Sequence, residues 1–307
     1  MTHDPQPASP ASLASAASSV SDARPASRPR IGVIMPAYNE ADRVEQTLET
    51  ITEYWAGGAK VSRIFLADDG STDSTIEIAD HAARALNLPL EILRLPHRGK
   101  AWTVRTAMLQ VAASSDLDYL MMLDADNELR IDQLDRVVWA DDPRTIYIGR
   151  RSRTIADSPG ATPSPFRRVM SGVMRLASRI LLGINFRDTQ CGFKLFPRAI
   201  AADLFGQQRS TSWTFDAELL LIANRISGIP VQEVDVTWSP RGTSKVGLAA
   251  PISSGFALLG TALNRARGVY RPIGSSPVAA QGPAAPSAPG APVVPPTGST
   301  GARRAGS

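Results

Sequence analysis

The stretch DYLMMLDADNE, residues 118–128, holds the pattern from which the fold and the site are predicted. An apolar run at residues 119–123, typical of a buried strand, leads into Asp124 and Asp126 with only Ala125 between them. Two carboxylates at this spacing repel each other unless positive charge lies between them. The stretch therefore predicts a buried strand that ends at a site for a divalent cation, alone or with a charged ligand.

The same apolar-to-polar change occurs three more times before this stretch. Apolar runs at 31–35, 64–67 and 90–95 predict strands, and the residues between them follow helical spacing. The predicted helices cover residues 40–54, 74–86 and 101–112. This alternation predicts an α/β fold, a Rossmann-like and mostly parallel sheet with helices on both faces.

Polar segments follow each predicted strand. They are PAYNE at 36–40, ADDGSTDST at 67–75, HRGK at 97–100 and DADNE at 124–128. Taken singly, Asn39, Ser71 or Asp73 is explained as a helix cap and Gly70 as a turn residue. Because the carboxyl ends of parallel strands share one edge of a sheet, the four segments together predict one ligand crevice.

Composition separates a folded middle from two tails. Residues 1–29 and 273–307 are rich in Ala, Ser and Pro without apolar periodicity, so we expect disordered tails around a folded domain at 30–272. The net charge of +4 includes Arg303 and Arg304 of the C-terminal tail. The balance left for the domain is too small to indicate a nucleic-acid partner. A lone cysteine, Cys191, excludes an internal disulfide and fits a reducing cytosol, and the N-terminus lacks the pattern of a signal peptide.

The motifs PAYNE, ADDGSTDST and DAD, in this order, resemble the inverting family 2 glycosyltransferases with a GT-A fold, which move a sugar from a nucleotide diphosphate to an acceptor. Two later stretches, DTQCGFKLF at 188–196 and WTFDAELL at 213–220, look more like the dolichyl-phosphate and polyprenyl-phosphate glucosyltransferase branch. The resemblance covers nearly all of residues 30–272.

The resemblance implies a role for particular residues. Asp124 and Asp126 would hold Mg²⁺ or Mn²⁺ against the donor diphosphate, and Arg150, at the end of a further strand with Arg151 beside it, would contact the donor phosphates. The donor site would comprise Pro36, Ala37, Tyr38, Glu40, Asp68, Asp69, Lys100, Ala125 and these charged residues. The acceptor side would comprise Asp188, Gln190, Ser244 and Lys245, the last two in a mobile loop RGTSKVG at 241–247.

The chain departs from the family pattern at two places. Gly99-Lys100-Ala101-Trp102 stands where the family usually has Gly-Lys-Gly. After the DAD motif, Asn127 and Glu128 replace the Gln that mannosyl-type relatives supply as a further metal ligand.

The acceptor decides whether a general base is needed. A lipid monophosphate is already anionic near neutral pH, so it requires positioning and leaving-group stabilisation. A hydroxyl acceptor requires a base, for which Asp216 and Asp188 are the candidates. Asp216 is equally explained as a carboxylate in the first turn of a helix.

Residues 166–184 predict a helix with two alternative functions. Arg168, Arg175 and Arg179 fall on one face, opposite an apolar face of Met170, Val173, Met174, Ala177, Ile180 and Leu181. Either the helix lies at a membrane surface, or it packs its apolar face on the sheet. The uncharged segment 246–263 is predicted to lie on a surface or in the core rather than to span a bilayer.

The predicted function is a hexosyltransferase, cytoplasmic and peripheral at the inner face of the membrane, that transfers a hexose from UDP-glucose to a polyprenyl phosphate. The alternatives are the same transfer from GDP-mannose, a soluble hexosyltransferase with a small hydroxyl acceptor, and a nucleotide-sugar binding module without turnover. The intact DAD motif and the basic loops argue against the binding module.

Overall fold

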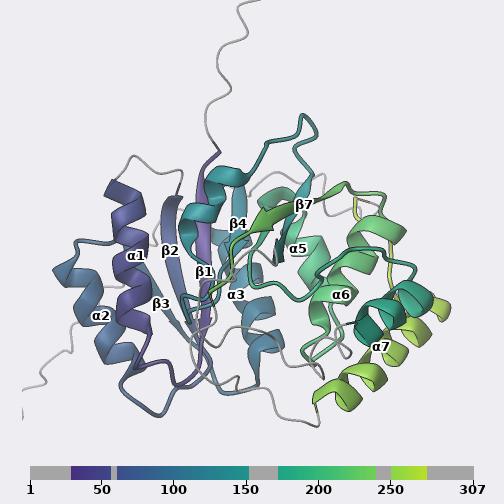
Figure 1. The fold of residues 1–307 in the computed structure, drawn as a ribbon, viewed down its shortest axis with the longest axis horizontal. Helices are drawn as coiled ribbons and strands as arrows, with labels where there is room; N and C mark the ends of the chain where they lie inside the picture. The colour runs from purple at the N-terminus through teal and green to yellow at the C-terminus, as the bar shows by residue number, and fades with distance from the viewer. Residues whose placement is uncertain (1–28, 57–60, 152–171, 240–249, 275–307) are drawn as a thin grey trace, which may run out of the picture. The chain divides into compact units, whose positions relative to one another are not determined.

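A seven-stranded sheet organises the structure, a computed structural model that describes residues 29–56, 61–151, 172–239 and 250–274 (Figure 1). The strands are β1 (Ile31–Ala37), β2 (Val61–Asp68), β3 (Leu90–Arg94), β4 (Tyr119–Met122), β5 (Ile146–Arg151), β6 (Lys194–Pro197) and β7 (Val231–Val236). Their order is β3-β2-β1-β4-β6-β5-β7. The mostly parallel sheet predicted from the sequence is confirmed, with one exception: β6 runs antiparallel to both β4 and β5.

Helices cover both faces of the sheet, as predicted. They are α1 (Val44–Ala56), α2 (Thr75–Ala85), α3 (Lys100–Ser114), α5 (Arg198–Gly206), α6 (Phe215–Leu220), α7 (Ala250–Ala266), the 3₁₀ helix η1 (Ile131–Arg136), and the π-helical η2 (Ser178–Leu182) and η3 (Leu221–Ile226). One core packs under α1, α2 and η1, and the other under α3, α5, α6, η3 and α7. In Figure 1, α1 and α2 lie together at one end of the sheet, and α6 and α7 lie at the other.

Side chains of β4 alternate between these two cores. Leu120 and Met122 pack in the core under α3, while Tyr119, Met121 and Leu123 pack in the core under α1. A strand buried on both faces needs apolar residues at successive positions, which explains the continuous run before the carboxylates. The strand ends at Met122, one residue before the predicted end.

The predicted helix at 40–54 begins later than its spacing suggested. The Glu40 carbonyl oxygen accepts from the amides of Arg43 and Val44, both at 2.9 Å, so residues 41–43 form a turn and α1 begins at Val44. The later start leaves residues 38–43 as a loop at the carboxyl end of β1.

The strand order creates a switch point. From β1 the chain adds β2 and then β3 on one side, and returns to place β4 on the other side of β1. Loops after β1 and β4 therefore leave the same edge in opposite directions, and a switch point of this kind is where open α/β sheets bind ligands. Since β6 is antiparallel, the residues that precede it, 188–193, reach this same edge.

In the helical segment 172–182, the predicted apolar residues do not all lie on one face of the helix. Met174, Ala177 and Leu181 pack against the core, but Val173 and Ile180 are exposed. The helix therefore divides its apolar residues between the sheet and the surface, because its apolar arc is wider than one packing face. Arg168 and Met170 lie outside the described residues.

Helix α7 lies on the surface with one side in the core, as predicted for 246–263 in the part from 250 that the structure describes. Leu258 and Thr261 are buried, whereas Phe256 and Leu263 are exposed. Across the described ranges, none of the helices combines the length and apolarity needed to cross a bilayer. Predictions for the tails at 1–28 and 275–307, and for Ser244 and Lys245, fall outside the described residues.

Candidate active site

The DAD turn projects its carboxylates at the switch-point edge, directly after β4. Thr47 Oγ1 of α1 donates to the Ala125 carbonyl oxygen at 2.8 Å, and the Asn127 amide donates to a second α1 threonine at 3.1 Å. Asn127 adopts φ 54°, a left-handed conformation that Asn tolerates. Helix α1 thus fixes the turn that carries Asp124 and Asp126.

Lys100, the first residue of α3, pairs with the first of these carboxylates. Its Nζ lies 2.5 Å from Asp124 Oδ1, and each side chain is 25% exposed. Burial alone would lower the pKa of Lys100, but the charges of Asp124 and Asp216 outweigh it and raise the pKa. Burial would likewise raise the pKa of Asp124, and the Lys100 ammonium more than offsets this and lowers it. Both groups are therefore charged at neutral pH.

Asp126 lies in a different electrostatic environment. Burial and the neighbouring charge of Asp124 raise the pKa of Asp126 to about 6. One ammonium thus does not neutralise the two carboxylates, and the turn carries the excess negative charge that suits a divalent cation.

Among the residues that the structure describes, no third protein ligand joins the two aspartates. Asn127 is directed toward α1, and Glu128 accepts from the Trp238 indole nitrogen at 2.9 Å. Over the ranges that the structure covers, no cluster of three or more His, Cys, Asp or Glu side chains is placed to hold a metal ion. Two carboxylates still fit Mg²⁺ or Mn²⁺, because Mg²⁺ in nucleotide sites takes one or two carboxylates and completes its shell with phosphate oxygens and water.

Asp216 lies below this site in a buried ion pair. Lys194 of β6 has no exposed surface, and its Nζ lies 3.1 Å from Asp216 Oδ1 and also donates to the Cys191 carbonyl oxygen. Burial raises the pKa of Asp216, and Lys194 and Lys100 offset only part of the rise. The residue stands in the first turn of α6, as its alternative interpretation proposed. An ion-paired carboxylate that is 5% exposed is a poor match for the predicted general base.

The structure brings Arg151, and not the predicted Arg150, to the site. Successive side chains on β5 point to opposite faces, and Arg150 forms a two-point ion pair with Asp235 of β7. Arg151 instead binds Asp188 through two contacts, at 2.6 and 3.0 Å, and its charge contributes to the low pKa of Asp124. The contact of Arg150 with donor phosphates stays a prediction, and in this structure its guanidinium is paired with Asp235.

The predicted acceptor-side residues Asp188 and Gln190 lie beside these charges. The Gln190 backbone amide donates to Asp188 Oδ1 at 3.2 Å, and its side chain donates to the Trp213 carbonyl oxygen at 3.4 Å. The Trp213 ring is 49% exposed and lies 5.5 Å from Lys100 Nζ. Asp188 has a pKa below its usual range, because Arg151 outweighs the effect of burial, which also makes it a poor base.

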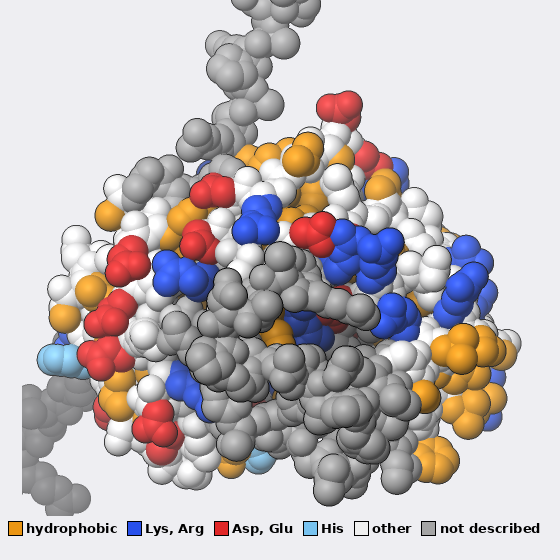
Figure 2. All heavy atoms as spheres, in the orientation of Figure 1, with side chains coloured by type: hydrophobic (Ala, Val, Ile, Leu, Met, Phe, Trp, Pro, Cys, Tyr) orange, Lys and Arg blue, Asp and Glu red, His pale blue; other side chains and the backbone are white. Residues whose placement is uncertain are grey.

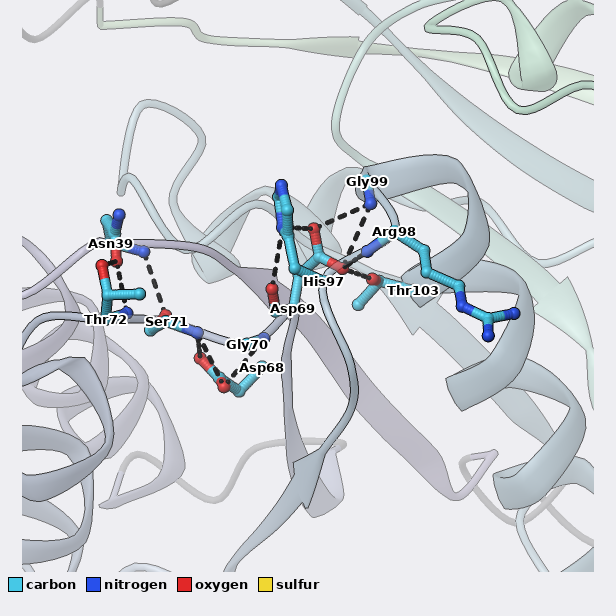
Figure 3. A network of polar contacts seen from close by, with 10 residues as sticks. All are labelled: Asn39, Asp68, Asp69, Gly70, Ser71, Thr72, His97, Arg98, Gly99 and Thr103. Atoms are coloured by element: carbon cyan, nitrogen blue, oxygen red, sulfur yellow. Dashed lines mark hydrogen bonds and ion pairs between the residues drawn. The ribbon is translucent and has the colours of Figure 1, made fainter.

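On the predicted nucleoside side, Asp69 organises a loop (Figure 3). Its carboxylate accepts from the backbone amides of Arg98 and Gly99, at 2.9 and 3.0 Å, and from Thr103 Oγ1 at 2.6 Å. His97 Nδ1 lies 2.9 Å from the other side of the same carboxylate. Through these contacts Asp69 positions the loop that leads into Lys100, and its predicted contact with the base or ribose stays a prediction.

Asp68 has a similar local role. It accepts from the backbone amides of Gly70 and Ser71 at 3.1 Å. Gly70 is in the left-handed region at φ 69°, and a Cβ there would lie 2.9 Å from the backbone nitrogen of His97. The turn after β2 therefore packs closely on the 97–99 loop.

The other predicted donor residues surround this network. Pro36 and Ala37 end β1, and Glu40 lies 3.5 Å from Arg43 while its amide donates to a threonine of α2 at 2.8 Å. Tyr38 stacks on His97, with ring centroids 4.2 Å apart and planes inclined by 21°. This aromatic pair is more than one third exposed at both residues and offers a stacking surface beside the loop.

No role was predicted for His97, Trp213 or Lys194, and Arg150 was preferred to its neighbour Arg151 for the phosphate contact. Lys194 did carry a signal, because it is a charged residue inside the otherwise apolar run CGFKLF.

The fold is that of the GT-A glycosyltransferases, and it places a carboxylate pair at the switch point of a mostly parallel sheet. The chain belongs to glycosyl transferase family 2, whose model matches residues 32–205.

Several relatives share one activity in their names. A dolichyl-phosphate beta-glucosyltransferase of Drosophila melanogaster is 32% identical over 235 residues, covering 70% of this chain and 69% of the relative. The Homo sapiens dolichyl-phosphate beta-glucosyltransferase is 28% identical, covering 71% of this chain and 69% of the relative. A relative with a different name, glycosyltransferase AglD of Haloferax volcanii, is 29% identical; the match covers 76% of this chain but only 37% of that relative.

Among solved structures, glucosyl-3-phosphoglycerate synthase of Mycobacterium tuberculosis, in complex with Mn²⁺, UDP-glucose and phosphoglyceric acid, aligns with a TM-score of 0.55 at 17% identity. The alignment covers 77% of this chain and 79% of that one. At this identity the likeness supports the fold alone.

Proposed function

We propose that the chain transfers glucose from UDP-glucose to a polyprenyl phosphate. Two things support the reaction class: the membership in family 2, and the paired carboxylates of the DAD turn flanked by Lys100 and Arg151. The choice of glucose and of a polyprenyl phosphate follows the dolichyl-phosphate beta-glucosyltransferases to which the chain is similar.

The observation that carries the choice of acceptor is the state of the two base candidates. Asp216 is buried against Lys194, and Asp188 is bound at two points by Arg151. In the part of the chain that is described, neither carboxylate is available to remove a proton from a hydroxyl acceptor. A phosphate acceptor brings its own negative oxygen and needs no base, so this arrangement supports it over a sugar or alcohol.

Asp124 and Asp126 would hold a divalent cation, which would neutralise the charge of the leaving nucleotide diphosphate. The chain's own cations contribute to the same end. Lys100 pairs with Asp124, and the charges of Lys100 and Arg151 both act on this carboxylate. Asp188 holds the Arg151 guanidinium in place before a substrate arrives. The positive charge is thus in place in advance, where charge develops in the transition state.

An apolar patch supports action at a membrane surface. It comprises the exposed side chains of Val173, Leu176, Ile180, Phe256, Leu259 and Leu263, from the helical segment 172–182 and from α7. These two helical segments contain no Asp or Glu, and Arg175 and Arg179 are exposed beside the patch. Figure 2 shows hydrophobic side chains gathered next to Lys and Arg at the end of the molecule where α7 lies. Apolar side chains flanked by cations suit the boundary between acyl chains and anionic headgroups.

The decisive experiment offers radiolabelled UDP-glucose and GDP-mannose separately, with polyprenyl phosphate in detergent, and counts the organic phase. We expect label from UDP-glucose only, and none with Asp124→Asn. Label from GDP-mannose alone would mean that the donor is GDP-mannose and not UDP-glucose. Label confined to a water-soluble product would refute the lipid acceptor.

Vesicle binding tests the membrane surface. Ile180→Ser combined with Phe256→Ser should reduce co-sedimentation with anionic vesicles, whereas Val138→Ser, an equally exposed residue outside the patch, should not. Arg175→Glu with Arg179→Glu should weaken binding by about 1 kcal/mol per arginine and remove its salt dependence. Unchanged co-sedimentation of both double variants would refute the assignment of this surface.

A further inference from the structure

The Lys100 ammonium holds one oxygen of Asp124, a carboxylate that is proposed to bind a metal ion. The Lys100 ammonium lies 2.5 Å from Oδ1. The other oxygen, Oδ2, packs on Gly192, where an added Cβ would lie 2.3 Å away. The carboxylate therefore has one crowded oxygen and one oxygen held by an ammonium. A cation that binds through Oδ1 meets a positive charge already there, and the two repel each other.

The surroundings of Lys100 allow its ammonium to change partners. The residue begins α3, and its flexible four-carbon side chain carries three donors. The negative groups whose charges act on it are Asp124, Asp126 and Asp216, and the Trp213 ring lies 5.5 Å away on another side. None of these holds the ammonium in a closed cage, since the side chain is 25% exposed.

A nucleotide diphosphate supplies the missing partner. Its charged oxygens are more numerous acceptors than one carboxylate oxygen, and a charged site beside the DAD turn is where this family's donor is proposed to bind. Once the ammonium contacts a phosphate, Asp124 Oδ1 is released to a metal ion.

We propose that Lys100 couples the binding of a divalent cation to the binding of the nucleotide diphosphate. Without the diphosphate, the ammonium holds Asp124 and competes with the cation. With the diphosphate bound, the ammonium moves to phosphate oxygens and the carboxylate is freed. The inference rests on the proposed function, because it takes a nucleotide diphosphate as the ligand. By linkage, the cation must raise diphosphate affinity by the same factor.

The test measures Mn²⁺ binding by calorimetry, with and without UDP, on the full chain and without any acceptor. In the unaltered protein, UDP should strengthen Mn²⁺ binding. In Lys100→Met, Mn²⁺ alone should bind about tenfold to a hundredfold more tightly, the range for loss of one charge-assisted hydrogen bond, and UDP should add much less. The affinity of UDP for Mn²⁺ in solution is common to all variants and cancels in the comparison.

Two further variants separate this role from a general loss of charge. Arg98→Met also removes a cation from this loop, but the Arg98 guanidinium lies over the Trp102 ring and not on Asp124. The Arg98→Met variant should therefore keep the coupling between Mn²⁺ and UDP. Lys100→Arg keeps the charge and should retain most of it. Lys100→Gln replaces Lys100→Met if thermal unfolding shows that the latter is not folded.

The outcomes are distinguishable from failure of the proposed function. Unchanged or weaker Mn²⁺ binding by folded Lys100→Met, or an equal effect of UDP in both proteins, overturns the coupling while leaving the transferase proposal intact. An unaltered protein that binds neither Mn²⁺ nor UDP overturns both proposals. Coupling without transfer to a polyprenyl phosphate overturns only the acceptor assignment.

Discussion

Gly192→Ala should damage catalysis without removing a functional group. The added Cβ would lie 2.3 Å from Asp124 Oδ2 and 2.7 Å from its Cγ, whereas ordinary contacts begin at 3.4 Å. Gly192 is not in the left-handed region, so the substitution adds no backbone strain there. The Asp124 carboxylate must instead move by about 1 Å, and a misplacement of that size costs roughly a hundredfold in rate.

The effect on folding should be much smaller than the effect on the reaction. Adding one methyl group to a packed position costs about 1–3 kcal/mol, which a folded domain tolerates. Transfer from UDP-glucose to polyprenyl phosphate gives kcat, and a thermal melt gives the stability. Gly206→Ala is the matched control, because a Cβ there meets nothing within 4 Å, and its kcat should equal that of the unaltered protein.

A folded Gly192→Ala variant with kcat within twofold of the unaltered protein would contradict this prediction. It would mean either that the Asp124 carboxylate is not held against Gly192, or that its position does not matter to the reaction. Recovery of the rate at high Mn²⁺ would show instead that only metal affinity had fallen.

Three further perturbations test other parts of the site. Asp124→Asn and Asp126→Asn should each abolish Mn²⁺ binding and transfer with little change in melting temperature, and excess chelator should do the same to the unaltered protein; transfer that survives chelation would exclude the metal role. Lys194→Met leaves a buried carboxylate unpaired and should destabilise the fold by about 3–5 kcal/mol in urea unfolding, while adding Asp216→Asn should restore most of the loss. The pKa of Asp188 lies below its usual 3.8 because its arginine partner outweighs burial, so its contribution is present above that value and lost as pH falls through the lower folded pKa. Asp188→Asn should therefore flatten the loss of stability below about pH 4, and an unchanged acid limb of the stability curve would contradict the pairing.

Local sequence patterns were sufficient to predict the strands and helices and the carboxylates of the DAD turn. A continuous apolar run is typical of a central strand that is buried on both faces, and the polar residues after it must lie at the strand's end. For this reason Asp124, Asp126 and the loops after β1, β2 and β3 could be predicted to meet. The motif resemblance added the family, which the match over residues 32–205 confirmed.

The role of each charged side chain was harder to predict, because it depends on direction as well as position. Arg150 and Arg151 are adjacent in sequence, and only the register of β5 against β7 directs one to Asp235 and the other to the site. Asp69 follows a strand as a ligand-binding residue would, but the loop that folds over it uses its oxygens.

Three features follow from the order of residues alone: the alternation of strands and helices, the edge at which the site is predicted, and the carboxylates of the DAD turn. Those features arise from residues close in the chain, whose spacing is set by backbone geometry. Two other features appear only in the folded domain: β6 runs antiparallel beside β4, which brings Asp188 and Lys194 near the DAD turn, and Lys100 pairs with Asp124. These pairings join distant segments, and ionic groups carry no periodic signal that names their partner, so packing of the whole domain selects them.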